Sequence, residues 1–376
     1  MAIRAVNAMP GVIGRYLFFE VARVWLVVAA VLLFLTLGLG FSRFIAEAAA
    51  GNLPVNTVLL LAMYSAIENA GIVLPISVLL AVLLTLGRLS RDNELVVMLA
   101  GGAGLLQLYR PFLVLAVIVA LLASGLSLFA APHAKRVMDG LTDETMALAL
   151  QTLAPGQFRT LLNGNAVFYA KQRSAEDGSL EDVFIRVQHV NREGELTQSV
   201  ATAERALQRS EPATGAQLLV LQDGWRYEGL PGTADYRIVR FEEHGMRVLP
   251  DQDKSAVEDV KTKPTAALLG NAQPAAAAEF QARLAVPISI LLLTLVGLPL
   301  GRVPPRAGRY GRIVSGVLLY AIYFNLVHLA KIWVQTETIP AALGIWVVHL
   351  GMLILAIFLI MRERGMFMRR KRKSAA

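Results

Sequence analysis

Six long apolar runs dominate this sequence and constrain what it can fold into. An α-helix needs about 20 predominantly apolar residues to cross the hydrocarbon core of a bilayer, and each run meets or approaches that length. The chain of 376 residues is 55% hydrophobic and only 17% charged, against about 25% charged in soluble domains. The sequence therefore predicts an α-helical membrane protein with six transmembrane helices. The runs are Val24–Ser42, Val55–Gly87, Pro111–Ala131, Leu284–Gly301, Ile313–Ala330 and Ala341–Met361.

Basic residues are distributed unequally between the segments that connect these runs. The N-terminal segment, the loops after the second and fourth runs and the C-terminal tail are rich in arginine, whereas the other short loops have only Arg43 and Lys331 as cations. Because lysine and arginine are enriched on the cytoplasmic side, we expect both termini in the cytoplasm. The net charge of +8 needs no nucleic acid to explain it, since a tail such as RRKRK beside a span more often meets anionic membrane lipids.

Between about Pro132 and Ala282 the apolar runs give way to another pattern. Short β-branched and aromatic stretches such as EDVFIRVQHV and DYRIVRFEEHGMRV alternate with turn signals such as Asp223-Gly224. This pattern predicts an all-β sandwich or jelly roll outside the cytoplasm, with a return linker at Lys254–Ala278. The residues predicted for its interior are Phe168, Phe184, Ile185, Val187, Leu219, Trp225, Tyr236, Ile238 and Phe241.

Three parts of the chain follow from these patterns. Residues 1–131 are predicted to form an N-terminal membrane half with spans one to three, including a short cytoplasmic helix at about 90–100. Residues 132–282 are predicted to form the β domain and its return linker. Residues 283–376 are predicted to form a C-terminal membrane half with spans four to six and a basic cytoplasmic tail.

A short polar interruption, LSRDNELVVMLAGG, separates the second and third runs. Ser90 or Asp92 can cap a helix whose first turn holds Glu94, where negative charge complements the helix dipole. Leu95 and Met98 then share one face at i and i+3. The residues alone leave two interpretations open, because such an amphipathic helix is either an ordinary capped loop or a docking element.

Several catalytic patterns are absent from the sequence. The phosphate-binding pattern GxxxxGK[ST] does not occur, so we expect no ATP hydrolysis by this chain itself. The chain has no cysteine, and its five histidines are scattered without an HExxH pattern, which predicts neither a metal site nor a bound cofactor. The serines lack a GxSxG setting. A hydrolase built from distant residues stays an alternative.

A series of motifs follows in order along essentially the whole chain. The series runs through RYLFFEVAR, GNLP, IVLPISVLLAVLLTLGRLS, RDNELVVMLAGG, LAPGQF, EDVFI, DGWRYEG, DYRIVRFEEH and ARLAVPISILLLTLVGLPLG. Together these motifs resemble the LptF/LptG family of lipopolysaccharide export permeases. The C-terminal stretch after them is more similar to the LptF branch than to the LptG branch. The alanine-rich linker and the basic tail depart from the family pattern.

The resemblance implies a subunit of an ABC transporter in the bacterial inner membrane, which extracts lipopolysaccharide and passes it to a periplasmic bridge. The implied partners are an LptG-like permease, an LptB-like ATPase dimer that binds ATP-Mg, and an LptC-like protein that meets the periplasmic β domain. The short helix is then the coupling helix, seated in a groove of the ATPase. The residues implied for this contact are Arg91, Asp92, Glu94, Leu95 and Met98.

Cations are expected where the phosphorylated headgroup of lipopolysaccharide meets the protein. Arg43 follows the first span and Lys331 ends the fifth, and both resemble basic positions of the family. Glu68 lies inside the second run, where a carboxylate facing lipid is unfavourable, so we expect it to face the bundle or a cavity. The alternative is structural: basic side chains snorkel to the interface, and Glu68 holds helices together.

A second class of function stays open beside transport. A membrane scaffold or adaptor would use its β domain merely to dock periplasmic proteins. The scaffold predicts that the chain has no effect on nucleotide turnover, whereas a permease subunit changes the turnover of its partner ATPase. A membrane hydrolase, in contrast, would be active as the isolated chain.

Overall fold

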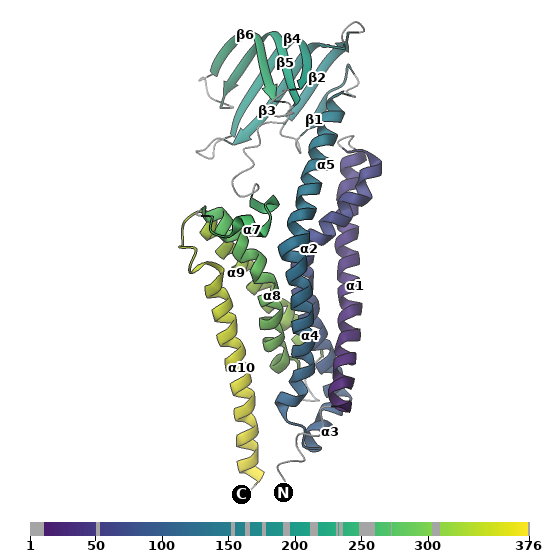
Figure 1. Ribbon diagram of the computed structural model, residues 1–376, viewed down its shortest axis with the longest axis vertical. Helices are drawn as coiled ribbons and strands as arrows, with labels where there is room; N and C mark the ends of the chain where they lie inside the picture. Colours follow the sequence, from purple (N-terminus) through teal and green to yellow (C-terminus); the bar gives the residue numbers. More distant parts are fainter. Residues whose placement is uncertain are drawn as a thin grey trace. The chain divides into compact units, whose positions relative to one another are not determined.

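The computed structural model describes most of the chain, in two compact units. The described residues are 11–49, 53–151, 155–161, 166–174, 178–190, 196–210, 217–230, 232, 236–247, 260–271, 273–302 and 309–374. The first unit, here the membrane unit, comprises Met1–Phe44, Leu59–Met138 and Ser255–Ala376. The second, here the β unit, comprises Ile45–Val58 and Asp139–Lys254. Figure 1 labels the elements of both.

Long helices build the membrane unit, and six segments of the described residues are long and apolar enough to cross a membrane. This confirms the predicted six-span architecture. The helical elements are α1 (Val12–Ala49), η2 (Val55–Thr57), α2 (Val58–Arg91), α3 (Glu94–Ala100), α4 (Leu105–Gly125), η3 (Leu126–Ala130), α5 (Ala131–Gln151), α7 (Thr265–Leu268), α8 (Pro274–Gly301), α9 (Arg309–Gln335) and α10 (Gly344–Ser374).

Helix α8 is central to the packing of the membrane unit, since it packs against α4, α9 and α10. It also approaches α2 closely through two glycines. A Cβ atom on Gly297 would lie 3.0 Å from Leu79 Cδ1, and one on Gly301 would lie 2.9 Å from Leu86 Cβ. These glycines are four residues apart, the spacing at which small residues let membrane helices pack tightly.

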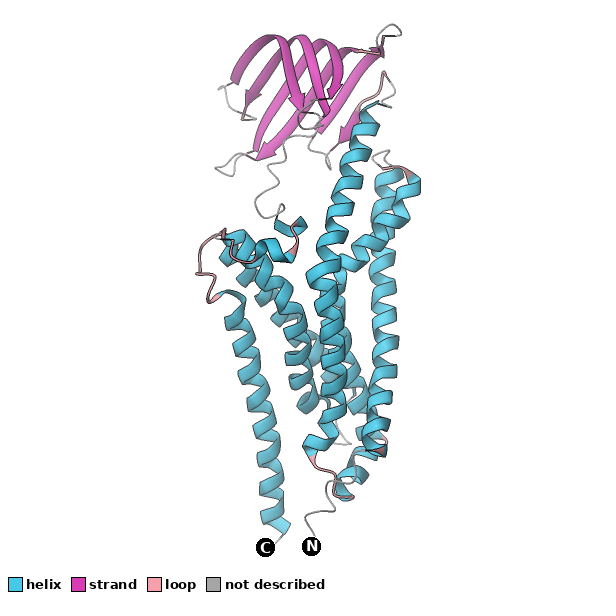
Figure 2. Cartoon of the chain, in the orientation of Figure 1, coloured by secondary structure: helices cyan, strands magenta, loops and turns pink. Residues whose placement is uncertain are grey.

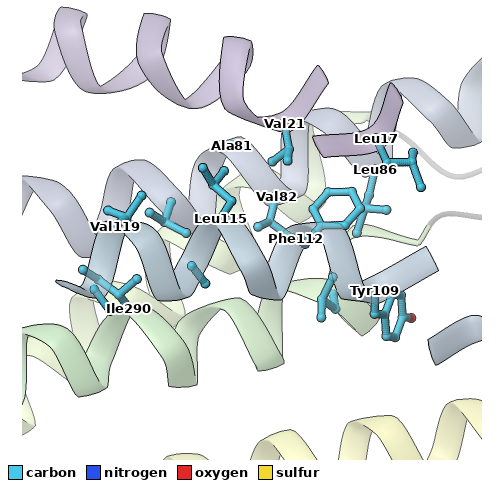
Figure 3. Close-up of a cluster of buried hydrophobic side chains, with 14 of the residues drawn as sticks. Leu17, Val21, Ala81, Val82, Leu86, Tyr109, Phe112, Leu115, Val119 and Ile290 are labelled. Carbon is cyan, nitrogen blue, oxygen red and sulfur yellow. The ribbon is translucent and has the colours of Figure 1, made fainter. Parts of the chain in front are cut away.

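A hydrophobic cluster joins α8 to the N-terminal helices. Its buried side chains include Val21 of α1, Val82 of α2, Phe112 and Leu115 of α4 and Ile290 of α8 (Figure 3). Most other side chains of α1 are not buried, as expected for a helix that faces lipid or a partner. The cluster therefore fixes α2, α4 and α8 as one packed body.

A single helical segment runs from α4 through η3 into α5, and the boundary predicted at Pro132 falls inside it. The middle element, η3, is π-helical, a geometry that often occurs at functional sites. Residues 254–259 and 272 of the predicted return linker lie outside the described residues. Its described part includes a helical turn at 260–262, the short α7 and the first turn of α8.

The described strands of the β unit form one antiparallel sheet in the order β1-β2-β3-β4-β5-β6 (Figure 2). The predicted all-β insert is confirmed. Each strand pairs with the next one in the chain, so the sheet is a meander rather than the crossed arrangement of a jelly roll. The strands are β1 (Arg159–Leu161), β2 (Ala166–Arg173), β3 (Leu180–Val190), β4 (Leu196–Ser210), β5 (Gln217–Gly229) and β6 (Tyr236–Arg247).

The predicted turn at Asp223-Gly224 is wrong, because β5 continues through it. Asp223 instead has a left-handed backbone with φ 52, which changes the alternation of side chains along the strand. Leu219 and Leu221 are buried before this point, and Gly224 is buried after it. Trp225 consequently faces outward and is 44% exposed, so its predicted interior position is wrong.

The other residues predicted for the interior divide by the face of the sheet on which they lie. Tyr236 and Ile238 of β6 pair with Gly229 and Tyr227, which follow Trp225 at two-residue spacing and share its outward face. They are 43% and 57% exposed, so their predicted interior position is wrong. Phe184 is half-buried. The remaining predicted residues belong to the hydrophobic core or pack against it: Phe168, Ile185, Leu219, Val187 and Phe241.

Candidate functional site

A cavity of about 190 Å³ lies within the membrane unit. Residues of α2, α4, η3, α5, α8 and α9 and of the segment before α7 line it. Apolar side chains alternate with charged ones along its wall, which is unusual inside helices of this hydrophobicity, because unpaired charge there is unfavourable. The charged lining residues of the described chain are Glu68, Lys135, Lys261, Glu279, Arg283 and Lys331.

Glu279, near the start of α8, lies between two of these cations. Its Oε2 accepts a hydrogen bond from Lys331 Nζ of α9 at 2.7 Å, and its Oε1 accepts one from Arg283 Nε at 3.0 Å. The side chains of Glu279, Arg283 and Lys331 are 11%, 4% and 18% exposed. A cluster of this burial is stable only while each charge keeps a partner.

Arg283 uses every N–H group of its guanidinium. Besides its bond to the carboxylate on α8, Nη1 donates to the Lys263 carbonyl and to Thr265 Oγ1, both at 2.9 Å. Nη2 donates to the carbonyls of Val260 and Lys261 at 3.2 and 3.0 Å. With all five donors engaged, Arg283 fixes the segment before α7 to the wall of the cavity.

The π-helical turn joins the same point. The Ser127 hydroxyl donates to the Arg283 carbonyl at 3.0 Å, and the Thr265 hydroxyl donates to the Leu128 carbonyl. The Leu128 carbonyl belongs to this π turn, so the bond from Thr265 ties the stretch before α7 directly to η3. Three segments far apart in the sequence, η3, the stretch before α7 and α8, therefore meet at one wall.

Two of the three residues predicted to meet substrate line this cavity. Lys331 is held by Glu279, and Glu68 is an exposed residue of α2. Arg43 is not among the residues that line it; this exposed side chain lies over the ring of Phe44, 5.5 Å from its centroid. The structure thus brings Lys331 and Glu68 to one site and leaves Arg43 elsewhere.

Glu279 and Arg283 were missed by the sequence analysis. Their i,i+4 spacing just before an apolar run was the available signal, since such a pair can bond on one helix face. No local pattern links Glu279 to Lys331, because the two lie on different helices.

The short helix over 90–100 is α3, but its cap differs from the prediction. Helix α2 continues through Arg91, so Ser90 is a buried residue inside α2. Asn93 occupies the N-cap with φ 58. Asp92 lies between the two helices and pairs with Arg88 at 3.4 Å. This i,i+4 pair supports the last turn of α2, so neither Ser90 nor Asp92 caps α3.

Glu94, the first residue of α3, is held by side chains of two other helices. Tyr16 Oη of α1 donates to its Oε2 at 2.8 Å, and Arg88 Nη1 of α2 donates to its Oε1 at 3.0 Å. Arg88 Nη2 also lies 3.1 Å from Glu20 Oε1. Glu94 therefore connects α3 to both α1 and α2.

The other residues predicted for the coupling contact form two groups, one buried and one exposed. Leu95 is buried and Met98 packs against the hydrophobic core, so both face the bundle. Arg91 and Asp92 are more exposed and pair with each other at 3.2 Å. The outward apolar residues of α3 are Val96 and Val97, which are 53% and 69% exposed. Sequence reasoning missed these two valines.

Comparison with known proteins covers both units. Residues 15–362 match the family described as "Lipopolysaccharide export system permease LptF/LptG". The chain is 29% identical over 354 residues to the lipopolysaccharide export system permease protein LptF of Escherichia coli K12, which covers 93% of this chain and 94% of that protein. The LptF of Shigella flexneri is similar to the same extent. The chain belongs to the LptF/LptG family of lipopolysaccharide export permeases.

Proposed function

We propose that this chain is one permease half of an ATP-driven exporter that extracts lipopolysaccharide from the inner membrane and passes it to a periplasmic bridge. The cavity between the spans carries the proposal, because it combines apolar walls with the ammonium groups of Lys331 and Lys261. A phosphorylated lipid has acyl chains that suit apolar walls and phosphates that suit cations. Lys331 and Glu68 would meet the headgroup there, and Arg43 would meet it outside the cavity.

The energy source in this proposal is a partner. The chain lacks a phosphate-binding loop, so an LptB-like ATPase dimer would bind and hydrolyse ATP-Mg. Helix α3 is the proposed contact, through Glu94, Arg91 and Asp92 together with the exposed Val96 and Val97. Leu95 and Met98 would transmit the movement inward, because they pack against the bundle. An LptG-like permease and an LptC-like periplasmic protein would complete the assembly.

The spacing along α2 supports this arrangement. Glu68 of the cavity and Arg88 beside α3 are 20 residues apart in one helix, which corresponds to about 30 Å along its axis. That length matches the hydrocarbon core of a bilayer. The proposal places α3 and both termini in the cytoplasm and the β unit in the periplasm, in agreement with the arginine-rich connecting segments.

Purification from the native host in mild detergent tests the proposal against a scaffold. The transporter predicts stoichiometric recovery of an ATPase with a phosphate-binding loop, a second six-span permease and lipopolysaccharide. Mass spectrometry would identify the proteins and the lipid. Recovery of periplasmic proteins without an ATPase would instead favour the scaffold.

Charge reversal at Lys331 tests the substrate site. We expect Lys331→Glu to lower the yield of lipopolysaccharide that copurifies with the complex, because a carboxylate repels the phosphates. Lys171→Glu is a matched control, since Lys171 is a surface residue of the β unit paired with Asp182. Equal lipid yields from wild type and Lys331→Glu would contradict the proposed site.

A further inference from the structure

One of the three described lysines that line the cavity, Lys331, is already bound to an anion of the protein. Glu279 Oε2 lies 2.7 Å from Lys331 Nζ, the distance at which a phosphate oxygen would bind the same ammonium group. Both side chains are largely buried, so water screens their attraction weakly. A ligand phosphate that binds Lys331 must therefore displace, or share the lysine with, this carboxylate.

We propose that Glu279 is a built-in competitor for the headgroup phosphates, which sets how tightly Lys331 holds the lipid and helps to release it. This inference rests on the proposed function, because it assigns a regulatory role within the same cavity. Glu279 thus determines specificity for an anionic lipid by competing with its phosphates, and it does not itself bind the lipid.

The second partner of Glu279 makes the exchange feasible. When Lys331 turns to a phosphate, Glu279 keeps its 3.0 Å bond to Arg283, so no buried charge loses every partner. Arg283 cannot follow the ligand, because its other donors bind the segment before α7 and the Thr265 hydroxyl. Lys331 is the mobile member of the cluster, since an ammonium group on a flexible stem can reorient.

The exchange also favours one class of headgroup. A phosphate monoester carries more negative charge than a carboxylate and can replace Glu279 at Lys331. A headgroup without an accessible anionic group cannot replace Glu279 at Lys331. When the lipid moves on, Glu279 takes Lys331 back, which prevents the cavity from retaining its substrate.

The test uses the assembled transporter in nanodiscs of neutral phospholipid. The probes are diphosphorylated lipid A and the same lipid with both phosphates removed. We expect Glu279→Gln to bind diphosphorylated lipid A roughly tenfold more tightly, the size of effect that close charge pairs produce. Glutamine keeps an oxygen for Arg283 but no longer competes as an anion. Affinity for the dephosphorylated lipid should stay unchanged.

Two comparison variants distinguish the effect of the Glu279–Lys331 contact from the effect of the cavity's net charge. Glu68→Gln removes the same charge from the same cavity on α2, and we expect it to tighten binding less than Glu279→Gln does. In a Lys331→Gln background the gain from Glu279→Gln should fall to the size of the Glu68→Gln gain. Equal gains from both glutamate variants, or a gain from Glu279→Gln that keeps its full size without Lys331, would overturn the inference.

The remaining outcomes distinguish this inference from the proposed function. If Lys331→Gln leaves the binding of diphosphorylated lipid A unchanged, the proposed substrate site itself is wrong. If Lys331→Gln weakens binding and Glu279→Gln does not tighten it, only the competitor role is wrong. Should Glu279→Gln fail to assemble, Glu279→Asp keeps the charge and shortens the side chain by one methylene group, which draws the carboxylate back from Lys331, so tighter binding is again expected; unchanged binding would contradict the inference.

Discussion

Two ionic clusters near opposite ends of α2 use the same types of residue in different surroundings. At one end Arg88 contacts Glu20 and Glu94, and its side chain is 32% exposed. At the other, Glu279 is held between Arg283 and Lys331, and these side chains are 4–18% exposed. Water reaches Arg88 and Glu94, which are 32% and 30% exposed, more readily than it reaches any member of the second cluster, although Glu20 is only 16% exposed. The first is therefore suited to contact with another protein, and the second to exchange with another charge.

Removing Arg283 should give the largest loss of stability. Arg283→Gln would leave Glu279 with one cation and would remove most of the donors that hold the segment before α7. We expect the free energy of unfolding to fall by about 3–5 kcal/mol, as for other broken buried pairs. Thermal unfolding of the purified chain would measure it. Arg283→Lys should lower the free energy of unfolding by less, because lysine keeps the positive charge. An equal loss in both variants would show that the charge of Arg283 does not contribute to stability.

The same substitution in the exposed cluster should have a smaller effect. Arg88→Gln removes the contacts with Glu20 and Glu94, but water reaches Glu94, which is 30% exposed, and Glu20 keeps Arg23 as a neighbouring cation at 3.9 Å. We expect a loss of about 1 kcal/mol, within the range of exposed ion pairs. If Arg88→Gln destabilises the chain as much as Arg283→Gln does in the same unfolding assay, burial does not explain the difference between the clusters.

Glu94 should affect nucleotide turnover more than stability. We expect Glu94→Ala to lower ATP hydrolysis or lipid transport by the assembled complex, because α3 loses its connection to α1 and α2 and a charge on its surface. Tyr16→Phe removes only the 2.8 Å internal bond. If Glu94→Ala leaves ATPase attachment and transport unchanged, Glu94 is not a coupling residue. Equal defects in both variants would assign Glu94 to the internal connection rather than to the ATPase surface.

The smallest expected effect is that of ionic strength on the stability lost in each variant. Salt screens exposed charges and leaves buried pairs nearly unaffected. Raising salt from 0.05 to about 0.5 M should therefore lower the stability lost in Arg88→Gln by a few tenths of a kcal/mol, while the loss in Arg283→Gln stays constant. Parallel unfolding curves at both salt concentrations would measure this, and equal salt sensitivity of both losses would contradict it.

The sequence predicted the six spans because each apolar run is long enough to determine its own structure. Sequence patterns gave wrong predictions at two places where one residue adopts the αL backbone conformation. Asn93, in the αL conformation, occupies the N-cap of α3 that was predicted for Ser90 or Asp92, and the αL conformation of Asp223 turns Trp225 outward. The cavity was only half predicted, because Glu279 and Lys331 meet through the packing of α8 and α9. That contact depends on tertiary structure, which no nearby pattern encodes.

The π turn of η3 has a consequence for the rotational phase of the helix. A π turn contains one residue more than the α-helical turn it replaces, and each residue of an α-helix rotates the chain by about 100°. Because the wider turn absorbs this extra residue, deleting one residue within Leu126–Ala130 would restore an ordinary helix and leave the rotational phase of α5 nearly unchanged, whereas a deletion in a regular α-helix rotates everything after it by about 100°. Lys135 would still face the cavity it lines. The π turn thus lengthens this helix by one residue without changing the side that it presents to the cavity.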